Sequence, residues 1–405
     1  MNKKICLYLH VHQPHRIKNY QIFDIGNNSN YFDLKKQNNI NKQVFDKVSK
    51  KSYIPMNNLL YKLLVTNKKF KINFSITGTL IEQANLYDKN VLQSFIKLSN
   101  TKKVEILGET YYHSLASLYS ETEFKKQVKK HTRTIKKYFN MRPQFFRNTE
   151  LIYSNNIAQI AEDLKFKGII TEGTPRILGW RSPNYLYKTN TRKSINLLLK
   201  NYVLSDDVAW RFSNKHWVEH PLSADKYIHW LDNTPGDVIN LFMDYETFGE
   251  HHWEDTNIFQ FFEDFVKKAL NLGYEFIKVS ESSKSLKPKD RIDSPFTISW
   301  ADEQRDTSAW TENSMQQDSL RKIYTLEKDI MKSKSKLLKN RWRRLQTSDH
   351  FYYMCTKWFN DGDAHKYFSP YSTPYEAFNN FNNALIDLKL SLKEELLNGN
   401  LCKQR

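Results

Sequence analysis

The stretch VINLFMDYETFGEHHWED, residues 238–255, decides the expected fold. Its first six residues are almost entirely apolar and show no alternation, which is typical of a strand buried on both faces of a parallel sheet. The strand runs directly into Asp244 and Glu246, and two histidines follow. Because burying a carboxylate costs several kcal/mol without partners, this pair indicates the functional edge of the sheet.

Similar apolar runs recur along the first 300 residues and alternate with amphipathic stretches. The further expected strands are residues 5–11, 71–77, 103–107, 144–147, 167–171, 201–205 and 275–279. Ser120 and Glu123 predict the start of a helix that runs to about Phe139. Thr256 is expected to cap the next long helix, which Gly273 ends. Alternating βα units of this number predict a parallel sheet, and residues 313–346 and 374–397 predict a helical C-terminal region.

The composition is that of a globular protein, with 405 residues, 40% hydrophobic and 26% charged. The three cysteines share no metal-ligand spacing, which favours a reducing compartment. The net charge of +18 comes from short groups on expected helices, and only RWRR at residues 341–344 suggests nucleic acid. No apolar run approaches the roughly 20 residues of a membrane span. We expect a cytoplasmic protein without a nucleic-acid or membrane partner.

Histidines and carboxylates cluster near the expected strand ends. In HVHQPHR, residues 10–16, strand geometry puts His10 and His12 on one face, where they could bind a metal, bind sugar hydroxyls or form a core pair. Glu105 lies within the strand of KVEILGETYYHS, with Glu109 and His113 after it. Glu150 follows a strand in FFRNTELIYSN.

A fifth motif, SWADEQRDTSAWTENSMQ at residues 299–316, places Asp302, Asp306 and two tryptophans, one of them Trp310, in a single segment. Acidic groups, imidazoles and flat indole rings together suit sugars, whose hydroxyls need polar partners. Two carboxylates facing a glycosidic bond are the minimum machinery for its hydrolysis. The chain has no P-loop and no dinucleotide fingerprint, so carboxylates are the best candidate nucleophiles.

Five stretches, in the order HVHQP, GETYYHS, FRNTEL, FMDYETFGEH and SWADEQRDTSAW, resemble the conserved regions of glycoside hydrolase family 57. The similarity is closest to the shorter α-amylase-type members and covers about the first 315 residues. It implies an α/β fold, an incomplete (β/α)7 barrel at residues 1–300, followed by a helical region at 301–405 that also contributes to the cleft. It also implies retaining action on α-1,4-glucans or maltooligosaccharides without a metal or other cofactor.

Carried over by motif, the resemblance makes Glu150 the nucleophile and Asp244 the general acid/base. The positions that match or lie beside the sugar subsites of the family are His10, His12, Glu105, Glu246, Trp253, Asp306 and Trp310. Arg147 stands where some members carry a tryptophan. Trp253, the aromatic residue after the acid/base, is slightly displaced from its position in the glucanotransferases of the family.

Three alternatives remain open at this point. A sugar acceptor in place of water would make the enzyme a 4-α-glucanotransferase on the same site. A metal-dependent polysaccharide deacetylase would use His10, His12 and Asp244 as ligands. A non-catalytic glycan-binding relative would keep the fold with a decayed site, although both catalytic carboxylates are present.

Overall fold

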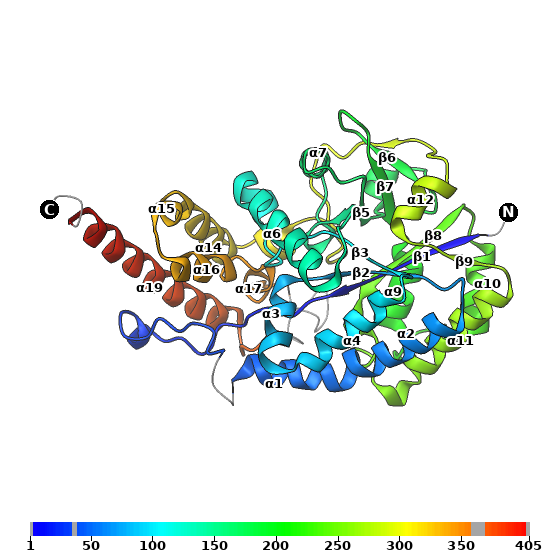
Figure 1. The fold of residues 1–405 in the computed structure, drawn as a ribbon, viewed down its shortest axis with the longest axis horizontal. Helices are drawn as coiled ribbons and strands as arrows, with labels where there is room; N and C mark the ends of the chain where they lie inside the picture. The colour runs from blue at the N-terminus through cyan, green and yellow to red at the C-terminus, as the bar shows by residue number, and fades with distance from the viewer. Residues whose placement is uncertain (1–2, 35–38, 358–368, 402–405) are drawn as a thin grey trace. The chain divides into compact units, whose positions relative to one another are not determined.

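The computed structural model describes residues 3–34, 39–357 and 369–401 (Figure 1). The chain forms two compact units. The barrel unit comprises Met1–Gln13, Phe45–Tyr111 and Lys125–Trp300, and the helical unit comprises Pro14–Val44, Tyr112–Phe124 and Ala301–Arg405. That residues 1–300 form the catalytic part and residues 301–405 a helical part of the cleft remains a prediction about function.

The barrel unit contains two sheets, of order β3-β2-β1-β8 with β9 beside β1, and β10-β6-β7-β5-β4. In Figure 1, β1, coloured dark blue, lies between β8 and β2. The strand bounds are β1 Lys4–Val11, β2 Ile72–Ile76, β3 Val104–Ile106, β4 Phe145–Arg147, β5 Gly168–Glu172, β6 Tyr187–Thr189, β7 Asn196–Lys200, β8 Val238–Asp244, β9 Glu275–Phe276 and β10 Arg291–Ile292.

Two backbone links join the sheets into a barrel. On one side Gly108, just after β3, forms a parallel bridge with Phe146 of β4. On the other side the N–H of Asn201 donates to the carbonyl of Asn240 at 2.9 Å, and the Asn240 side chain donates to Leu199 at 2.9 Å. Within the described residues, β1, β2, β3, β4, β5, β7 and β8 therefore follow one another around the barrel, and their pairings are parallel.

The barrel interior is filled by side chains from successive strands. One core cluster combines Cys6 and Tyr8 of β1, Phe145 of β4, Leu198 of β7 and Phe242 of β8. Tyr8 and Phe242 meet edge to face at 5.6 Å. Because the interior is packed, the polar residues at the carboxyl ends of these strands are the ones that can reach a ligand.

Helices follow the strands, as the alternating pattern predicted. Those with all their residues in the barrel unit are the π-helical turns η2 Ser49–Tyr53 and η4 Asp207–Arg211, the 3-10 turns η3 Thr149–Leu151, η5 Tyr245–Thr247 and η6 Glu254–Thr256, and α2 Ile54–Thr66, α3 Gly78–Tyr87, α4 Lys89–Asn100, α7 Asn155–Asp163, α8 Pro175–Leu178, α9 Tyr202–Asp206, α10 Ala224–Asn233, α11 Ile258–Asn271 and α12 Val279–Ser285. Two helices contain residues of both units, α1 Ile40–Val48 and α6 Glu121–Phe139.

Two local predictions were wrong and two were confirmed. Residues 201–205 were expected as a strand, but α9 begins there because the Asn201 side chain accepts from the N–H of Leu204 at 3.1 Å. The real strand, β7, lies just before it. Thr256 does not cap α11, since its hydroxyl donates to the Trp253 carbonyl. The start of α6 after Ser120 and the left-handed Gly273 after α11 are as predicted.

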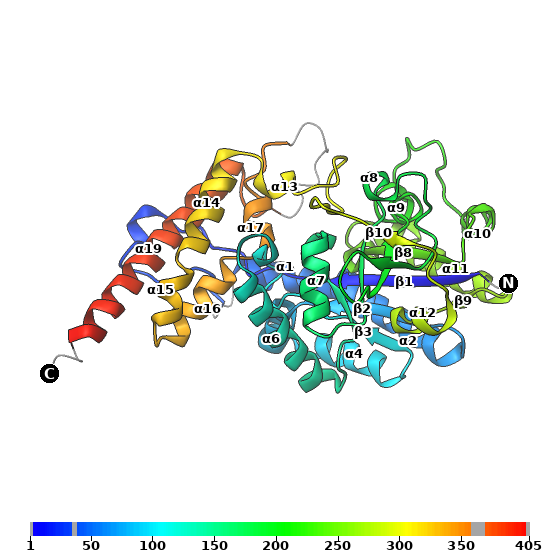
Figure 2. The ribbon, with the colours of Figure 1, turned by 90° about the horizontal axis from the view of Figure 1, so that it is seen from above.

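The helical unit is built on α19 Pro374–Leu401, and Figure 2 shows α14 and α16 beside it. The bounds of its other helices are η1 Ile22–Asp24, α5 Ala116–Tyr119, α13 Ser308–Thr311, α14 Ser314–Thr325, α15 Glu327–Lys332, α16 Lys336–Arg344 and α17 Ser348–Tyr352. The helical signals at 313–346 and 374–397 are confirmed.

The RWRR cluster lies in α16 and is used for packing within the helical unit. Arg343 forms a two-bond ion pair with the buried Glu123, at 2.7 and 3.1 Å. Trp342 is fully buried and donates to the carbonyl of Ile323 at 2.8 Å. Arg341 donates to Ser29 at 2.8 Å. These contacts give the cluster a structural role.

Across the described ranges, none of the helices combines the length and apolar character that a membrane crossing requires.

Candidate functional site

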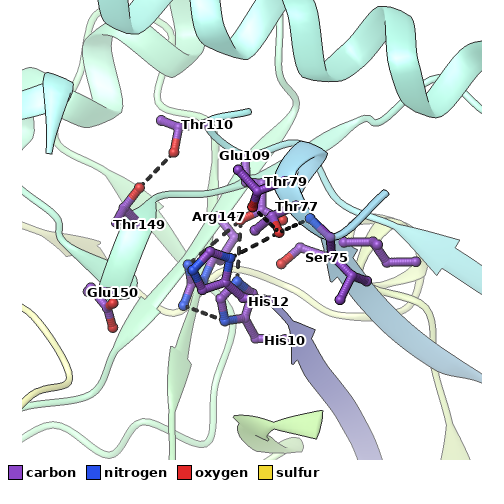
Figure 3. Close-up of polar contacts among 12 residues, drawn as sticks. His10, His12, Ser75, Thr77, Thr79, Glu109, Thr110, Arg147, Thr149 and Glu150 are labelled. Atoms are coloured by element: carbon purple, nitrogen blue, oxygen red, sulfur yellow. Dashed lines mark hydrogen bonds and ion pairs between the residues drawn. The ribbon is translucent and has the colours of Figure 1, made fainter. Parts of the chain in front are cut away.

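Glu150 occupies a strained turn directly after β4. Its φ of 55° lies in the left-handed region, as does that of Leu151 at 50°. A non-glycine residue pays about 1 kcal/mol or more for this conformation, so surrounding contacts must enforce it. The Thr149 hydroxyl is 2.7 Å from that of Thr110, and the Thr171 hydroxyl donates to the Leu151 carbonyl at 2.9 Å (Figure 3 shows the first contact). The turn therefore holds the Glu150 side chain in a defined direction.

Trp300 contacts Glu150 twice. Its backbone N–H donates to the Glu150 carbonyl at 3.2 Å, and its indole N–H donates to the carboxylate at 2.8 Å. The pairing of Ile298 with Tyr153 aligns the two segments, through two backbone bonds of 2.9 Å. The half-buried Glu150 carboxylate is thus oriented by a donor that comes from 150 residues away in the sequence.

Asp244 ends β8 and meets His10 of β1. The register of the two strands places these residues opposite each other, and His10 Nδ1 lies 3.3 Å from the Asp244 carboxylate. Burial raises the pKa of Asp244, but the hydrogen bond and charge of His10, together with His251, outweigh it and hold the pKa below its ordinary value. The negative charge of Glu150 acts in the opposite direction. Asp244 is therefore ionised at neutral pH, and the two carboxylates influence each other.

His10 is also the centre of a buried polar cluster (Figure 3). Its Nε2 lies 3.4 Å from the carboxylate of Glu109, and its Nδ1 lies 3.4 Å from the guanidinium of Arg147. The guanidinium is 3.9 Å from the Glu109 carboxylate. Among these side chains the fixed positive charge of Arg147 already stands beside Glu109, so this donor set suits a hydrogen-bonded cluster better than a metal cation.

His12 lies on the same face as His10, as the strand pattern predicted. The two rings are stacked, with centroids 5.8 Å apart and planes inclined by 15°. His12 Nδ1 is 3.0 Å from the Thr77 hydroxyl. This contact fixes the orientation of a ring that is only partly buried.

Glu246 is buried in the 3-10 turn η5, which directly follows Asp244. Its carboxyl is hydrogen-bonded to the Tyr53 hydroxyl, and the Gln13 amide donates to it at 3.5 Å. Burial and the charge of Asp244 raise the pKa of Glu246 to about 8. Glu246 is therefore protonated at neutral pH while its neighbour Asp244 is ionised, which is the separation expected of two carboxyls with different tasks.

The two histidines of the opening stretch have separate environments. His252 is buried, and it binds the 207–213 segment through the Ala209 carbonyl at 3.0 Å and the Ser213 hydroxyl at 2.7 Å. His251 stacks on Trp210, with centroids 5.1 Å apart and planes inclined by 17°. Burial lowers the pKa of His251 to about 4, although the Asp244 charge opposes this. Trp210 is 53% exposed, so a ring face remains open beside this histidine.

The remaining predicted site residues occupy other surroundings. The Glu105 carboxylate accepts from the N–H of Ser280 at 2.9 Å, at the first turn of α12. Trp253 is 53% exposed, with the Lys51 ammonium 3.9 Å from its ring centroid. In the helical unit, Asp306 accepts from Ser308 at the start of α13. Trp310 of the same helix is buried and packs 6.1 Å from Tyr352.

Sequence reasoning did not select Glu109, Arg147, Trp300 or Lys200 as site residues. Arg147 and Lys200 are the last residues of β4 and β7, and Glu109 follows β3 closely. A polar residue at the carboxyl end of an apolar run was the available signal. This signal was used to select carboxylates but was not used for the cations Arg147 and Lys200.

Sequence comparisons identify the family of this chain. The sequence profile of glycosyl hydrolase family 57 matches residues 6–295. A Methanocaldococcus jannaschii protein named "Putative alpha-amylase" is 45% identical, and the match covers 97% of this chain and 85% of that protein.

Two solved structures share the fold at low sequence identity. A family 57 branching enzyme from Thermococcus kodakaraensis has a TM-score of 0.68 at 14% identity, covering 98% of this chain and 94% of that one. A 4-alpha-glucanotransferase from Thermococcus litoralis has a TM-score of 0.67 at 13% identity, covering 86% of this chain and 56% of that one. The expected incomplete barrel with C-terminal helices is confirmed. Since the family profile spans most of the chain, this protein is a glycoside hydrolase that belongs to glycosyl hydrolase family 57.

Proposed function

We propose that this protein is an α-amylase-type enzyme that hydrolyses α-1,4-glucosidic bonds with retention of anomeric configuration. Glu150 is the nucleophile and Asp244 is the general acid/base. The substrate class is α-glucan or maltooligosaccharide, in keeping with the name of the 45% identical relative.

One observation carries the proposal. Glu150 and Asp244 come from the carboxyl ends of β4 and β8, and they lie near enough for the charge of Glu150 to raise the pKa of Asp244. A retaining enzyme needs two carboxyl groups roughly 5–6 Å apart, so that one can attack the anomeric carbon while the other serves the leaving oxygen. The strained backbone at Glu150 and its Trp300 donor further support a site built around this side chain.

In the first step a Glu150 oxygen forms a bond to the anomeric carbon, and the bond between that carbon and the glycosidic oxygen breaks. Asp244 delivers a proton to the departing oxygen. In the second step Asp244 takes a proton from water, whose oxygen displaces Glu150 from the sugar. The sugar leaves with its original configuration, and both carboxyl groups return to their starting states.

The contact between His10 and Asp244 influences the protonation of Asp244. His10 stabilises the ionised form of Asp244, which is the form required in the second step. For the first step the proton must reside on Asp244. Burial already raises the pKa of Asp244, so a bound glucan that removes further water from this carboxyl favours its protonated form.

A second activity, transfer of the glucosyl chain to a sugar hydroxyl, uses the same chemistry. The half-exposed ring of Trp210, stacked on His251 near Asp244, offers a face on which an acceptor sugar can pack. Product analysis separates the two activities. If the enzyme only hydrolyses, incubation with maltotriose yields shorter sugars alone. If it also transfers, longer oligosaccharides appear beside the shorter sugars.

The assignment of the two carboxylates is tested with an activated aryl α-maltooligoside. Glu150→Ala should abolish its cleavage, because no glycosyl-enzyme can form. Asp244→Ala should still release the aryl group in a burst and then stall. Added azide, which needs no base, should restore turnover of Asp244→Ala and give the α-glycosyl azide.

Glu254→Ala, in the exposed turn η6, is the matched control and should behave like the unmodified enzyme. Cleavage of starch by Glu150→Ala at near-normal rate, in protein free of contaminating amylase, would refute the assignment of the nucleophile. Failure of azide to restore Asp244→Ala would refute the assignment of the acid/base.

A further inference from the structure

Trp300, which orients Glu150, lies beside two cations from different strands. The guanidinium carbon of Arg147, at the end of β4, is 5.0 Å from the centroid of the Trp300 ring. The ammonium nitrogen of Lys200, at the end of β7, is 5.4 Å from it. Both distances are within the roughly 6 Å over which a cation is attracted to an indole face.

The Lys200 side chain is only 5% exposed, and lysine is rarely buried to this extent. Its ammonium group lies 2.7 Å from Asp206 and 3.6 Å from Glu172, which is fully buried. The backbone confines the same place, since a Cβ on Gly173 would come within 2.1 Å of the Lys200 carbonyl. A buried charge needs such partners, and the two carboxylates hold the ammonium in one position against the indole.

We propose that Lys200 is a positioning residue for the nucleophile and that it acts through the Trp300 indole. This inference rests on the proposed function, in which Glu150 is the nucleophile. In this proposal Lys200 acts on the nucleophile indirectly. It fixes the ring whose N–H donates to the Glu150 carboxylate at 2.8 Å.

The physical basis has two parts. A cation at the ring draws electron density from the indole, and this makes its N–H a stronger donor to an ionised acceptor. Contacts from two strand ends also remove rotational freedom from the ring, so the carboxylate is held in its attacking direction before substrate arrives. In a site shielded from water both effects are larger than they would be on the surface.

A double-mutant cycle on the glycosylation step tests the proposal. Trp300→Phe keeps an aromatic ring and removes the indole N–H, and Lys200→Met keeps roughly the chain length and removes the charge. Single-turnover release of the aryl group from an activated α-maltooligoside measures the step. Trp300→Phe should slow it by about 10- to 100-fold, the effect expected of a lost hydrogen bond to a charged group. Lys200→Met should slow it by about 5- to 20-fold with little change in KM.

The decisive measurement is the coupling between the two changes. If Lys200 acts through the indole N–H, Lys200→Met introduced into Trp300→Phe should slow the step by less than about 2-fold. Fully additive losses would overturn the proposal, because Lys200 would then act by another route. A loss that appears only in KM would also overturn it.

Lys200→Arg, which keeps the cation, should recover most of the rate lost in Lys200→Met. If Lys200→Met does not fold, Lys200→Gln takes its place, because its amide can still donate to Asp206. Lys4→Met, which removes a strand lysine paired with Glu275 at 3.4 Å, is the matched control and should leave the rate unchanged. An inactive Glu150→Ala together with additive losses refutes only the role of Lys200. An active Glu150→Ala refutes the proposed function itself.

Discussion

Replacing Glu246 by Gln should change how the stability of this protein depends on pH. Glu246 is buried, hydrogen-bonded to Tyr53 and close to the ionised Asp244, and its pKa is raised from 4.5 to about 8. In the folded protein it keeps its proton at neutral pH, whereas in the unfolded chain it loses that proton near pH 4.5. Glutamine has nearly the shape of the protonated carboxyl and does not titrate.

The sign of the effect follows from proton binding. Between pH 4.5 and about 8 the folded state binds one more proton than the unfolded state, so the stability contributed by Glu246 is complete below pH 4.5 and is lost as the pH rises through 8. At about 1.4 kcal/mol per pH unit, a difference between 4.5 and about 8 corresponds to roughly 5 kcal/mol, of which about 4 kcal/mol should be lost between pH 5 and pH 9. Glu246→Gln should not show this loss.

The assay is reversible urea unfolding of both proteins at pH 5, 7 and 9, with the difference in unfolding free energy as the result. Glu246→Gln should become progressively more stable relative to the unmodified protein as the pH rises. Difference infrared spectroscopy supplies a direct check, because the C=O stretch of a protonated carboxyl should disappear near pH 8 only in the unmodified protein.

Glu254→Gln, an exposed exchange in the same loop, reports any pH effect of a Glu-to-Gln change itself. A difference between the unmodified protein and Glu246→Gln that stays constant from pH 5 to pH 9 would refute the reasoning. It would mean that Glu246 is ionised in the folded protein, with a positive partner that the described contacts do not include.

His10→Gln should raise the pKa of Asp244, since burial is then no longer offset by the His10 hydrogen bond and charge. The stability that the lowered pKa of Asp244 provides is present above its pKa in the unfolded chain and is lost as the pH falls through its pKa in the folded protein. In the variant this loss therefore moves to higher pH, and carboxyl ¹³C NMR titration measures the change in pKa. Asn73→Ala should lower the free energy of unfolding by about 2–4 kcal/mol, because the buried amide donates to two backbone carbonyls at 2.9 and 3.1 Å and accepts from an N–H at 2.8 Å, which chemical denaturation can check. Dialysis against a chelator should leave the proposed glucan-cleaving activity unchanged, since Arg147 already supplies the positive charge beside Glu109. Activity lost to the chelator and restored by zinc would favour a metal-dependent deacetylase.

The linear sequence was sufficient where a signal is local. Unbroken apolar runs located β1, β2, β5 and β8 to within about a residue, because strands buried on both faces need such runs. The helix predictions for the C-terminal region were also confirmed, because helical periodicity is likewise a local signal. The run at 201–205 failed because apolar residues without clear periodicity fit a strand or a helix equally well, and the Asn201 cap decides for the helix.

The sequence also identified the family and the two candidate carboxylates, because the family and both residues are recognised from motifs in a fixed order. It could not say which groups surround them. His10 meets Asp244 only because β1 and β8 are neighbours in register, although 234 residues separate them in the chain. Trp300 reaches Glu150 because residues 298 and 153 pair their backbones.

The protonation of the site was decided by tertiary structure alone. Asp244 and Glu246 are two residues apart and chemically similar, yet the pKa of the first is lowered and that of the second is raised to about 8. The difference arises because His10 faces one carboxyl while the other is buried against Tyr53 and feels the charge of the first. A pKa depends on the solvent and charges within a few ångströms of the group, and only the folded chain determines which charges those are.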